Sequence, residues 1–462
     1  MSREDAARWA AGLEGVMERI EARFGRVEPR RRALAYLRGL LSPIERKNGW
    51  PLAETAGDRT PDGMQDFLAR VHWDADRVGD DLRASGVEHL GDAQAVLVLD
   101  ETGFVKKGAK SCGVQRQYSG TAGRIENCQI GVFLSYASRS GQALIDRALY
   151  LPESWASDPQ HRAAAGVPET ITFATKPKRG RALLERAFAT GVPCAWVVGD
   201  SVYGADHALR RGIEQPGRGH VLTVTSAQRL GLKPVADWLE DGPATADTGG
   251  GWQRLSAGDG AKGPRLHDGA YLPDRGDAAA GWQKGLLIRC KIKKPEAFTF
   301  CLTLAPTGTP LAELVRVAGA RWTVESCFAT AKGEGGLDHY AVRLGTGWHR
   351  HITLAMLAHA YLAVLRKTAA GSGGKTGTGR QHRARLTAGV WSGHIRPTPN
   401  AFSPGRCGDA GTSSAPVAAI GNGEPTPMKP GCSTRTARTM ANSASASPPM
   451  PKLACTTSWC TR

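Results

Sequence analysis

The chain has 462 residues, with 60 lysines and arginines against 43 aspartates and glutamates, which gives a formal net charge of +17. This length predicts two or three domains, and 41% apolar residues suffice for a sizeable core. No apolar run approaches the roughly 18 residues of a membrane helix, and the N-terminus lacks the apolar segment of a secretion signal. Ten cysteines occur without a C-x-x-C pair, which argues against a zinc site or a disulfide framework. We therefore expect a cytoplasmic protein, neither secreted nor in a membrane.

About half of the net charge lies in the last fifth of the chain. Residues 369–462 contain 11 lysines and arginines against two acids, Asp409 and Glu424, and their apolar residues follow no helix or strand period. We predict a disordered basic tail. It is either a solvated segment that adds nonspecific DNA affinity, or sequence translated out of the ancestral frame beyond about Thr368. Four scattered cysteines in this tail favour the second explanation.

Residues 1–93 are predicted to be helical. Apolar residues recur at helical spacing from Ala33 to Leu41, directly after the basic run Arg30–Arg32, and again from Met64 to Val71. Two interpretations remain open, a helical bundle with a solvated basic rim and a DNA-binding domain.

The periodicity then changes to that of an α/β domain. Two continuous apolar runs, 95–99 and 195–199, predict buried strands that each end at an aspartate. Between them, 125–138 and 142–151 predict an antiparallel hairpin around Arg139–Gly141, and a helix is predicted over 181–190. A further helix (206–213) and strand (220–225) follow. This order predicts a mixed sheet with helices on its faces.

A Gly-rich, irregular segment is predicted from 227 to 285, with Trp252 and Trp282 inside it. Strand patterns resume at 286–290 and 298–302. Two helices, over 311–332 and 351–367, close the part of the chain that is predicted to fold.

Asp100 and Asp200 are the strongest functional candidates. Each follows an apolar strand, and ligand sites of α/β sheets gather at the carboxyl ends of strands. Two such carboxylates on neighbouring strands repel each other unless a cation lies between them, and hard oxygen ligands suit Mg²⁺ or Mn²⁺. The alternative is that each aspartate is a turn residue, before Thr102–Gly103 and Tyr203–Gly204 respectively.

A third carboxylate lies on the predicted helix 311–332. Arg321, Glu325 and Lys332 are spaced by four and seven residues, so they share one helix face. An ordinary solvated salt-bridge stripe is one explanation. The neighbouring residues look buried, however, and a buried carboxylate needs a partner such as a metal ion or Arg321.

Basic residues follow Asp100 without a compensating acid before Glu126. They alternate with glycines and with the aromatics Phe104 and Tyr118, a composition that suits a passing phosphate backbone. A solvated loop is the alternative. The basic residues are Lys106, Lys107, Lys110, Arg116 and Arg124.

These residues together resemble the DDE transposases of bacterial insertion sequences, in the branch with a Tyr-Arg-Glu-Lys signature. Arg321-x3-Glu325-x6-Lys332 matches three of the four signature residues, and Ala318 stands at the tyrosine position. Ordered blocks that also resemble this group are 97–103, 113–126, 173–177, 199–204, 335–343 and 350–354. The resemblance runs from about Arg46 to Lys367.

The resemblance implies an RNase H-like fold, with Asp100 on the first strand, Asp200 on the fourth and Glu325 on a helix after a β-rich insertion. The expected segments are an N-terminal helical domain (1–93), a catalytic domain in two parts (94–226 and 306–368), the insertion (227–305) and the tail (369–462). Trp252 and Trp282 are candidates for stacking on a displaced base, although core packing is the commoner role.

The resemblance also implies an activity. Asp100, Asp200 and Glu325 are expected to hold two Mg²⁺ or Mn²⁺ ions for DNA cleavage at element ends and strand transfer into target DNA. Arg321 and Lys332 are expected to hold phosphates, with the protein acting as a dimer on paired ends of double-stranded DNA. Two alternatives remain, a host RNase H-like nuclease and an idle or domesticated DNA-end-binding remnant.

Overall fold

The computed structural model describes residues 3–239, 251–260, 263–274, 276 and 278–371. Residues 372–462, nearly all of the predicted basic tail, lie outside the described residues. Within the described ranges, no helix combines the length and the apolar character that crossing a membrane requires.

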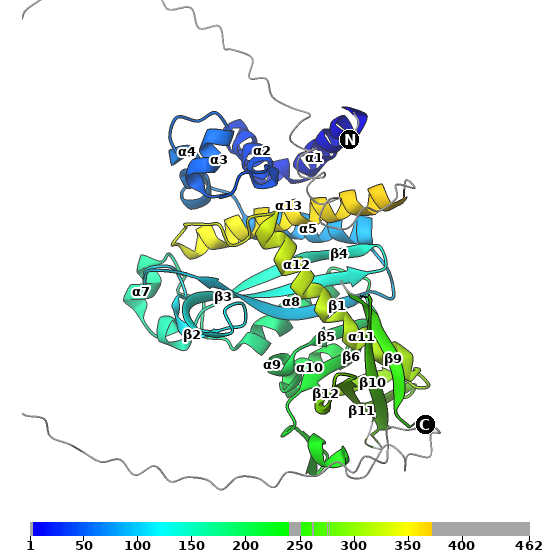
Figure 1. Ribbon diagram of the computed structural model, residues 1–462. Helices are drawn as coiled ribbons and strands as arrows, with labels where there is room; N and C mark the ends of the chain where they lie inside the picture. Colours follow the sequence, from blue (N-terminus) through cyan, green and yellow to red (C-terminus); the bar gives the residue numbers. More distant parts are fainter. Residues whose placement is uncertain (1–2, 240–250, 261–262, 275, 277, 372–462) are drawn as a thin grey trace, which may run out of the picture. The chain divides into compact units, whose positions relative to one another are not determined.

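The N-terminal region is helical, as predicted. It comprises α1 (Arg3–Ile20), the short 3-10 turn η1 (Glu21–Arg23), α2 (Val27–Leu41), α3 (Gly49–Thr55), α4 (Asp62–Ala69) and α5 (Ala75–Leu90). Helices α1, α2, α4 and α5 pack on the last helix, α13 (Gly345–Gly371). In Figure 1, α1 to α4 lie above α13 and α5 runs beside it.

Three residues of α13 fasten the N-terminal helices by polar contacts. Arg350 donates hydrogen bonds to the carbonyl oxygens of Leu68 (3.1 Å) and Trp73 (2.9 Å). The buried hydroxyl of Tyr36 lies 2.8 Å from Nδ1 of His351, and the hydroxyl of Tyr361 donates to the carbonyl of Trp9. The N-terminal helices and α13 therefore share one core.

A mixed sheet forms the centre of the molecule. Its first strands are β1 (Val96–Val105), β2 (Gln115–Ser119), β3 (Arg124–Ser138), β4 (Gly141–Tyr150), β5 (Trp196–Gly199) and β6 (Gly219–Val224). The order β4-β3-β1-β5-β6 combines antiparallel pairing among the first three with parallel pairing of β1, β5 and β6. The predicted mixed sheet and hairpin are confirmed. In chain order β5 is the fifth strand, because the short β2 was not expected.

Helices cover both faces of this sheet. One face carries α5, α13 and α12 (Trp322–Gly333), where Phe133 of β3 contacts Phe328 and Trp348. The other face carries α8 (Lys176–Ala189) and the short α9 (Ser201–Gly204), followed by α10 (His207–Glu214). The small helices α6 (Glu153–Ala156) and α7 (Pro159–Ala164) connect β4 to α8. Since β-strand side chains alternate between faces, neighbouring residues of β1 reach opposite helical layers.

The segment predicted to be irregular contains strands. After the small pair β7 (Arg229–Leu230) and β8 (Lys233–Pro234) and the 3-10 turn η2 (Val235–Leu239) come β9 (Gln253–Gly260), β10 (Gly263–Pro273), β11 (Trp282–Lys291) and β12 (Lys294–Pro306). Strand β12 pairs with β6, so β12-β11-β10-β9 continue the central sheet to ten strands among the described residues. The local pattern predicted an irregular segment, which was wrong because cross-strand partners, rather than local periodicity, define these strands. The β-rich insertion that the resemblance implied is confirmed.

Two further predictions need correction. Strand β1 does not end at Asp100 but continues to Val105, because β3 pairs with it along its whole length. The predicted helix 311–332 is two helices, α11 (Leu311–Ala320) and α12, which meet at Arg321.

The approach of α11 to β9 leads to a prediction about Gly319. A Cβ at this position would press into the backbone carbonyl of Ala257, which cannot rotate away. We expect Gly319→Ala to lower the free energy of unfolding by about 1–3 kcal/mol, measured by urea denaturation. Gly15→Ala is the matched control, since nothing lies within 4 Å of its Cβ position on α1 and alanine favours a helix. Equal stability of the two variants would contradict this packing.

Candidate active site

Asp100 and Asp200 lie side by side at the end of a parallel strand pair. The β1–β5 ladder ends at the pair Leu99 and Gly199, and the two aspartates are the next residues. Asp200 also caps α9, because its Oδ1 accepts a hydrogen bond from the backbone N–H of Val202 at 2.9 Å. Asp200 is therefore both a turn residue and a neighbour of Asp100.

Both carboxyl groups are harder to ionise than usual. Burial, opposed by the backbone N–H of Glu101 and by Arg321, raises the pKa of Asp100 from 3.8 to about 7. Burial and the charge of Glu101 raise the pKa of Asp200. The charge of Asp200 contributes to the shift of Asp100. Burial is thus the main reason why these carboxyl groups resist ionisation, and the neighbouring acids add to it.

Arg321 lies between Asp100 and Glu325. Its guanidinium is 3.3 Å from Oδ2 of Asp100 and 3.6 Å from Oε1 of Glu325. The break between α11 and α12 falls at Arg321, so Glu325 is in the first turn of α12. The side chain of Glu325 is 50% exposed, against 14% for Asp100. The expectation of a buried third carboxylate was wrong.

Lys332 reaches the same side of β1 from the last turn of α12. Its Nζ donates to Oγ1 of Thr102 at 2.8 Å and lies 3.3 Å from Oγ1 of Thr121. Burial lowers its pKa. Since Asp100 and Thr102 are two residues apart on one strand, Arg321 and Lys332 both approach the sheet face that carries Asp100.

The carboxylates match the chemistry of a hard divalent cation. Their donor set is oxygen only, and two of the three have raised pKa values that such a cation would reverse. Among the described residues, however, no three His, Cys, Asp or Glu side chains are gathered closely enough to hold an ion. Asp100 and Asp200 fit as a pair of ligands, and Arg321 stands between Asp100 and the third carboxylate.

The basic residues after Asp100 are not in one loop. Lys106, Lys107 and Lys110 lie in the loop between β1 and β2, whereas Arg116 belongs to β2 and Arg124 begins β3. Lys107, Lys110, Arg116 and Arg124 are exposed, and Arg124 pairs with Glu126 at 2.7 Å. Of the two aromatics, Tyr118 is exposed and Phe104 is buried in the core.

Lys106 differs from its neighbours. Its Nζ lies 3.4 Å from the centre of the Tyr340 ring and donates to the carbonyl of Tyr340 at 3.1 Å. Burial lowers the pKa of Lys106 to about 8. This lysine therefore holds the segment after α12 against the end of β1.

A second polar network was missed from the sequence. Glu101 accepts hydrogen bonds from the hydroxyl of Tyr203 (2.7 Å) and from Nζ of Lys176 (2.6 Å) on the face opposite Asp100. Tyr203 is fully buried, and burial together with Glu101 raises its pKa well above 10. The network ties α8 and α9 to β1. The available signal was that Glu101, Tyr203 and Lys176 all fall within the blocks that resemble the transposases.

The raised pKa of Asp100 predicts a pH-dependent stability difference. Between 3.8 and about 7 the folded state binds a proton that the unfolded state does not, so ionisation of Asp100 destabilises the fold as pH rises through this window. In EDTA, we expect Asp100→Asn to raise the melting temperature at pH 8 and to have less effect at pH 5. Glu45→Gln, at an exposed position, is the control. A shift independent of pH would contradict the assignment.

The Glu101 network predicts a cost for removing one hydroxyl. Tyr203→Phe leaves the buried ring in place but removes a donor to Glu101, which should lower the free energy of unfolding by about 1–3 kcal/mol in urea denaturation. Tyr118→Phe is the matched control, since Tyr118 is 63% exposed. If both changes cost the same, the hydrogen bond to Glu101 does not stabilise the site.

Comparison with known proteins relates this chain to a family of endonucleases and to a transposase. Residues 19–240 match the family described as DDE superfamily endonuclease. The "Probable transposase for insertion sequence element IS701" of Microchaete diplosiphon is 27% identical over 175 residues, which cover 37% of this chain and 43% of that relative. The resemblance to DDE transposases of insertion sequences is thereby confirmed. The family match contains Asp100 and Asp200 and stops before Glu325.

Proposed function

We propose that this protein is an insertion-sequence transposase that cleaves DNA at element ends and joins the freed ends to target DNA. The observation that carries the proposal is the adjacent placement of Asp100 and Asp200 at the end of the β1–β5 ladder, with α12 packed across the same strand. The matched endonuclease family and the transposase relative support the same proposal.

Asp100, Asp200 and Glu325 are the proposed ligands of two divalent cations, Mg²⁺ or Mn²⁺. When bound, such ions lower the pKa of water and stabilise the leaving oxygen of a phosphodiester. For Glu325 to join the two aspartates, the side chain of Arg321 has to leave its place beside Asp100. The half-exposed position of Glu325 gives its carboxylate room to move.

The chemistry is a phosphodiester hydrolysis followed by a phosphodiester exchange. In the first step, the oxygen of water attacks phosphorus at the element end, a 5′-phosphate forms, and the 3′-oxygen takes up a proton and leaves as a hydroxyl. In the second, this 3′-oxygen attacks a phosphodiester of target DNA and displaces another 3′-oxygen, so the number of phosphodiester bonds is conserved. Neither step needs a covalent bond between protein and DNA.

Arg321 and Lys332 are proposed to hold phosphate oxygens next to the carboxylates. Arg321 offers a planar fork of donors that suits a phosphate. Lys332 donates its hydrogen bonds to neutral hydroxyl and carbonyl oxygens of β1 and of Thr121, and among the described residues no carboxylate forms an ion pair with it, although the charge of Asp338 acts on it. Both cations would lower the energy of a transition state that gathers negative charge.

Double-stranded DNA is proposed to run along the exposed basic residues of β2 and of the loop between β1 and β2. Lys107, Lys110 and Arg116 carry this part of the proposal, with Tyr118 exposed among them. Phosphate contacts of this kind give affinity that falls with salt concentration. The proposed assembly is a dimer on paired ends. The N-terminal helices stay a candidate DNA-binding region.

Asp100→Asn tests the proposal directly. The amide keeps the shape of the side chain but cannot serve as a charged metal ligand, so we expect cleavage of duplexes carrying the element ends to fall by on the order of 100-fold or more in Mg²⁺. Binding of the same duplexes should stay within about threefold. The duplex sequence comes from the DNA that flanks the gene.

Glu45→Gln serves as the control for loss of one surface carboxylate and should leave both measurements unchanged. Near-normal cleavage by purified Asp100→Asn would refute the assignment of Asp100. Loss of binding together with cleavage would instead indicate a general defect of the fold.

A further inference from the structure

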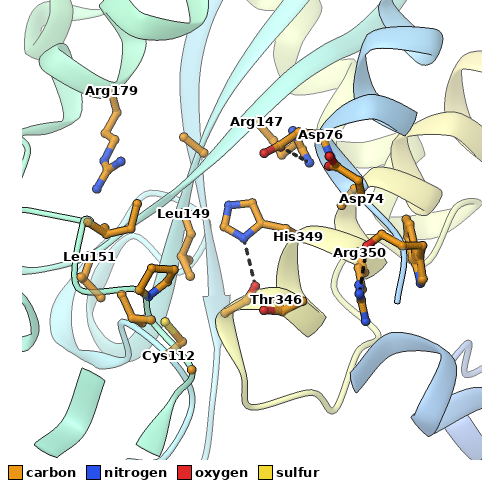
Figure 2. A pocket seen from close by; sticks show the side chains of 18 of the residues that line it. Asp74, Asp76, Cys112, Arg147, Leu149, Leu151, Arg179, Thr346, His349 and Arg350 are labelled. Atoms are coloured by element: carbon orange, nitrogen blue, oxygen red, sulfur yellow. Dashed lines mark hydrogen bonds and ion pairs between the residues drawn. The ribbon is translucent and has the colours of Figure 1, made fainter. Parts of the chain in front are cut away.

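A cavity of about 590 Å³ lies at the edge of the sheet beside β4. Its wall combines the last residues of β4, the start of α5, the start of α13, the first turns of α8 and residues 166–171. A volume between about 300 and 1,000 Å³ is typical of small-molecule sites. Figure 2 shows arginine side chains approaching this space from two sides, with the ring of His349 between them.

The cavity wall carries more positive charge than its acids neutralise. Arg186 is paired with Asp146 at 3.0 Å and Arg147 with Asp76 at 2.8 Å. Arg179, in contrast, has no carboxylate within ion-pairing distance among the described residues, and its closest polar contact is the carbonyl oxygen of Thr172 at 3.5 Å. Arg350 donates only to backbone carbonyls. The charge of Asp74, which also lines the cavity, acts on Arg350, so Arg179 is the arginine of this wall that is left without a neighbouring anion among the described residues.

Burial leaves some of these arginine donors without hydrogen-bond acceptors. The side chain of Arg147 is 3% exposed, and its Nε has no hydrogen-bond partner. The buried Nε of Arg179 also lacks one, and burial lowers the pKa values of Arg179 and Arg350. A buried donor without an acceptor destabilises the protein, and an anionic ligand in the cavity would supply the missing acceptor.

His349 can distinguish a phosphate from a carboxylate. Burial and the charge of Arg147 lower its pKa to about 4, so the ring is neutral at pH 7. Its Nδ1 lies 2.9 Å from the carbonyl oxygen of Gly345, which can only accept, so Nδ1 carries the proton and Nε2 is an acceptor. A monoprotonated phosphate can donate to Nε2 while its other oxygens accept from arginine. A carboxylate has no proton to donate.

We propose that this cavity binds a phosphate group, with Arg179 and Arg147 as donors, His349 as acceptor, and the N-terminus of α13 adding its favourable dipole. The apolar part of the wall, which includes Leu149, Val167 and Ile171, would accommodate whatever carries the phosphate. Neither the motifs nor the proposed cleavage reaction uses this cavity.

Helix α8 connects the cavity to the Glu101 network. Lys176, in its first turn, binds Glu101, and Arg179 is three residues farther, a rise of about 4.5 Å along the helix. Because the cavity lies near the candidate active site, a DNA strand that passes this site is one source of the phosphate. A free phosphate ester is the other source. Both sources share the chemistry that the cavity recognises.

Thermal unfolding of the purified full chain in EDTA tests the proposal without relying on cleavage. We expect inorganic phosphate to raise the melting temperature in a concentration-dependent way, relative to sodium chloride at equal ionic strength and pH 7. Arg179→Gln should lose most of this shift. Arg181→Gln is the matched control, because Arg181 lies on the same helix, is exposed and pairs with Glu185.

Ile171→Trp provides a second test that leaves every arginine in place and fills the cavity instead. It too should lose the phosphate-dependent shift. A shift that is absent from the wild-type protein, or equal in wild type, Arg179→Gln and Ile171→Trp, would overturn the proposal.

Competition identifies the source of the phosphate. Binding of a labelled 5′-phosphorylated duplex is measured with and without saturating inorganic phosphate, in wild type and in Arg179→Gln. Competition that occurs in wild type and disappears in Arg179→Gln supports a DNA phosphate as the ligand. A phosphate-dependent thermal shift without competition supports a free phosphate ester.

Discussion

The pairing of β1 with β5 is the constraint on which the candidate active site depends. A parallel ladder fixes the relative height of two strands, and this one ends with Leu99 opposite Gly199. The two aspartates that follow are therefore held as neighbours by backbone hydrogen bonds rather than by their own side chains. Their mutual repulsion is imposed by the sheet, which is why the fold can sustain a cluster of like charges.

The surrounding elements place positive charges beside these acidic residues. Arg321 meets Asp100 from the junction of α11 and α12, and Lys176 meets Glu101 from α8. The two cations approach from opposite faces because successive residues of β1 point in opposite directions. Arg321 lies at the break between two helices and Lys176 at the start of one, and each position brings a long basic side chain to a carboxylate.

Sequence patterns predicted the parts of this arrangement that local periodicity encodes. The runs 95–99 and 195–199 are apolar because β1 and β5 are buried on both faces, so the strands and the aspartates after them were visible. The course of β1 beyond Asp100 was not, since it depends on pairing with β3. The partners of Glu101 lie 75 and 102 residues away, a separation that no local pattern encodes.

The break at Arg321 escaped prediction for a related reason. The residues from Leu311 to Gly333 form a continuous helical pattern, and only the packing of α11 on β9 and of α12 on β1 and β3 separates them into two helices. Spacing still placed Arg321 and Lys332 toward one side. It did not reveal that Glu325 would be half exposed, with Arg321 between it and Asp100.

The position of α13 has a consequence for biosynthesis. This helix is the last described element to leave the ribosome, yet its side chains fill the core of the first helices and hold the carbonyl groups of Leu68 and Trp73. The N-terminal helices therefore cannot complete their packing during most of translation. Because α13 ends at Gly371, a change of reading frame after Thr368 would alter only the last three residues of this helix among the described elements. The sheet and the positions of Asp100, Asp200 and Glu325 all precede that point.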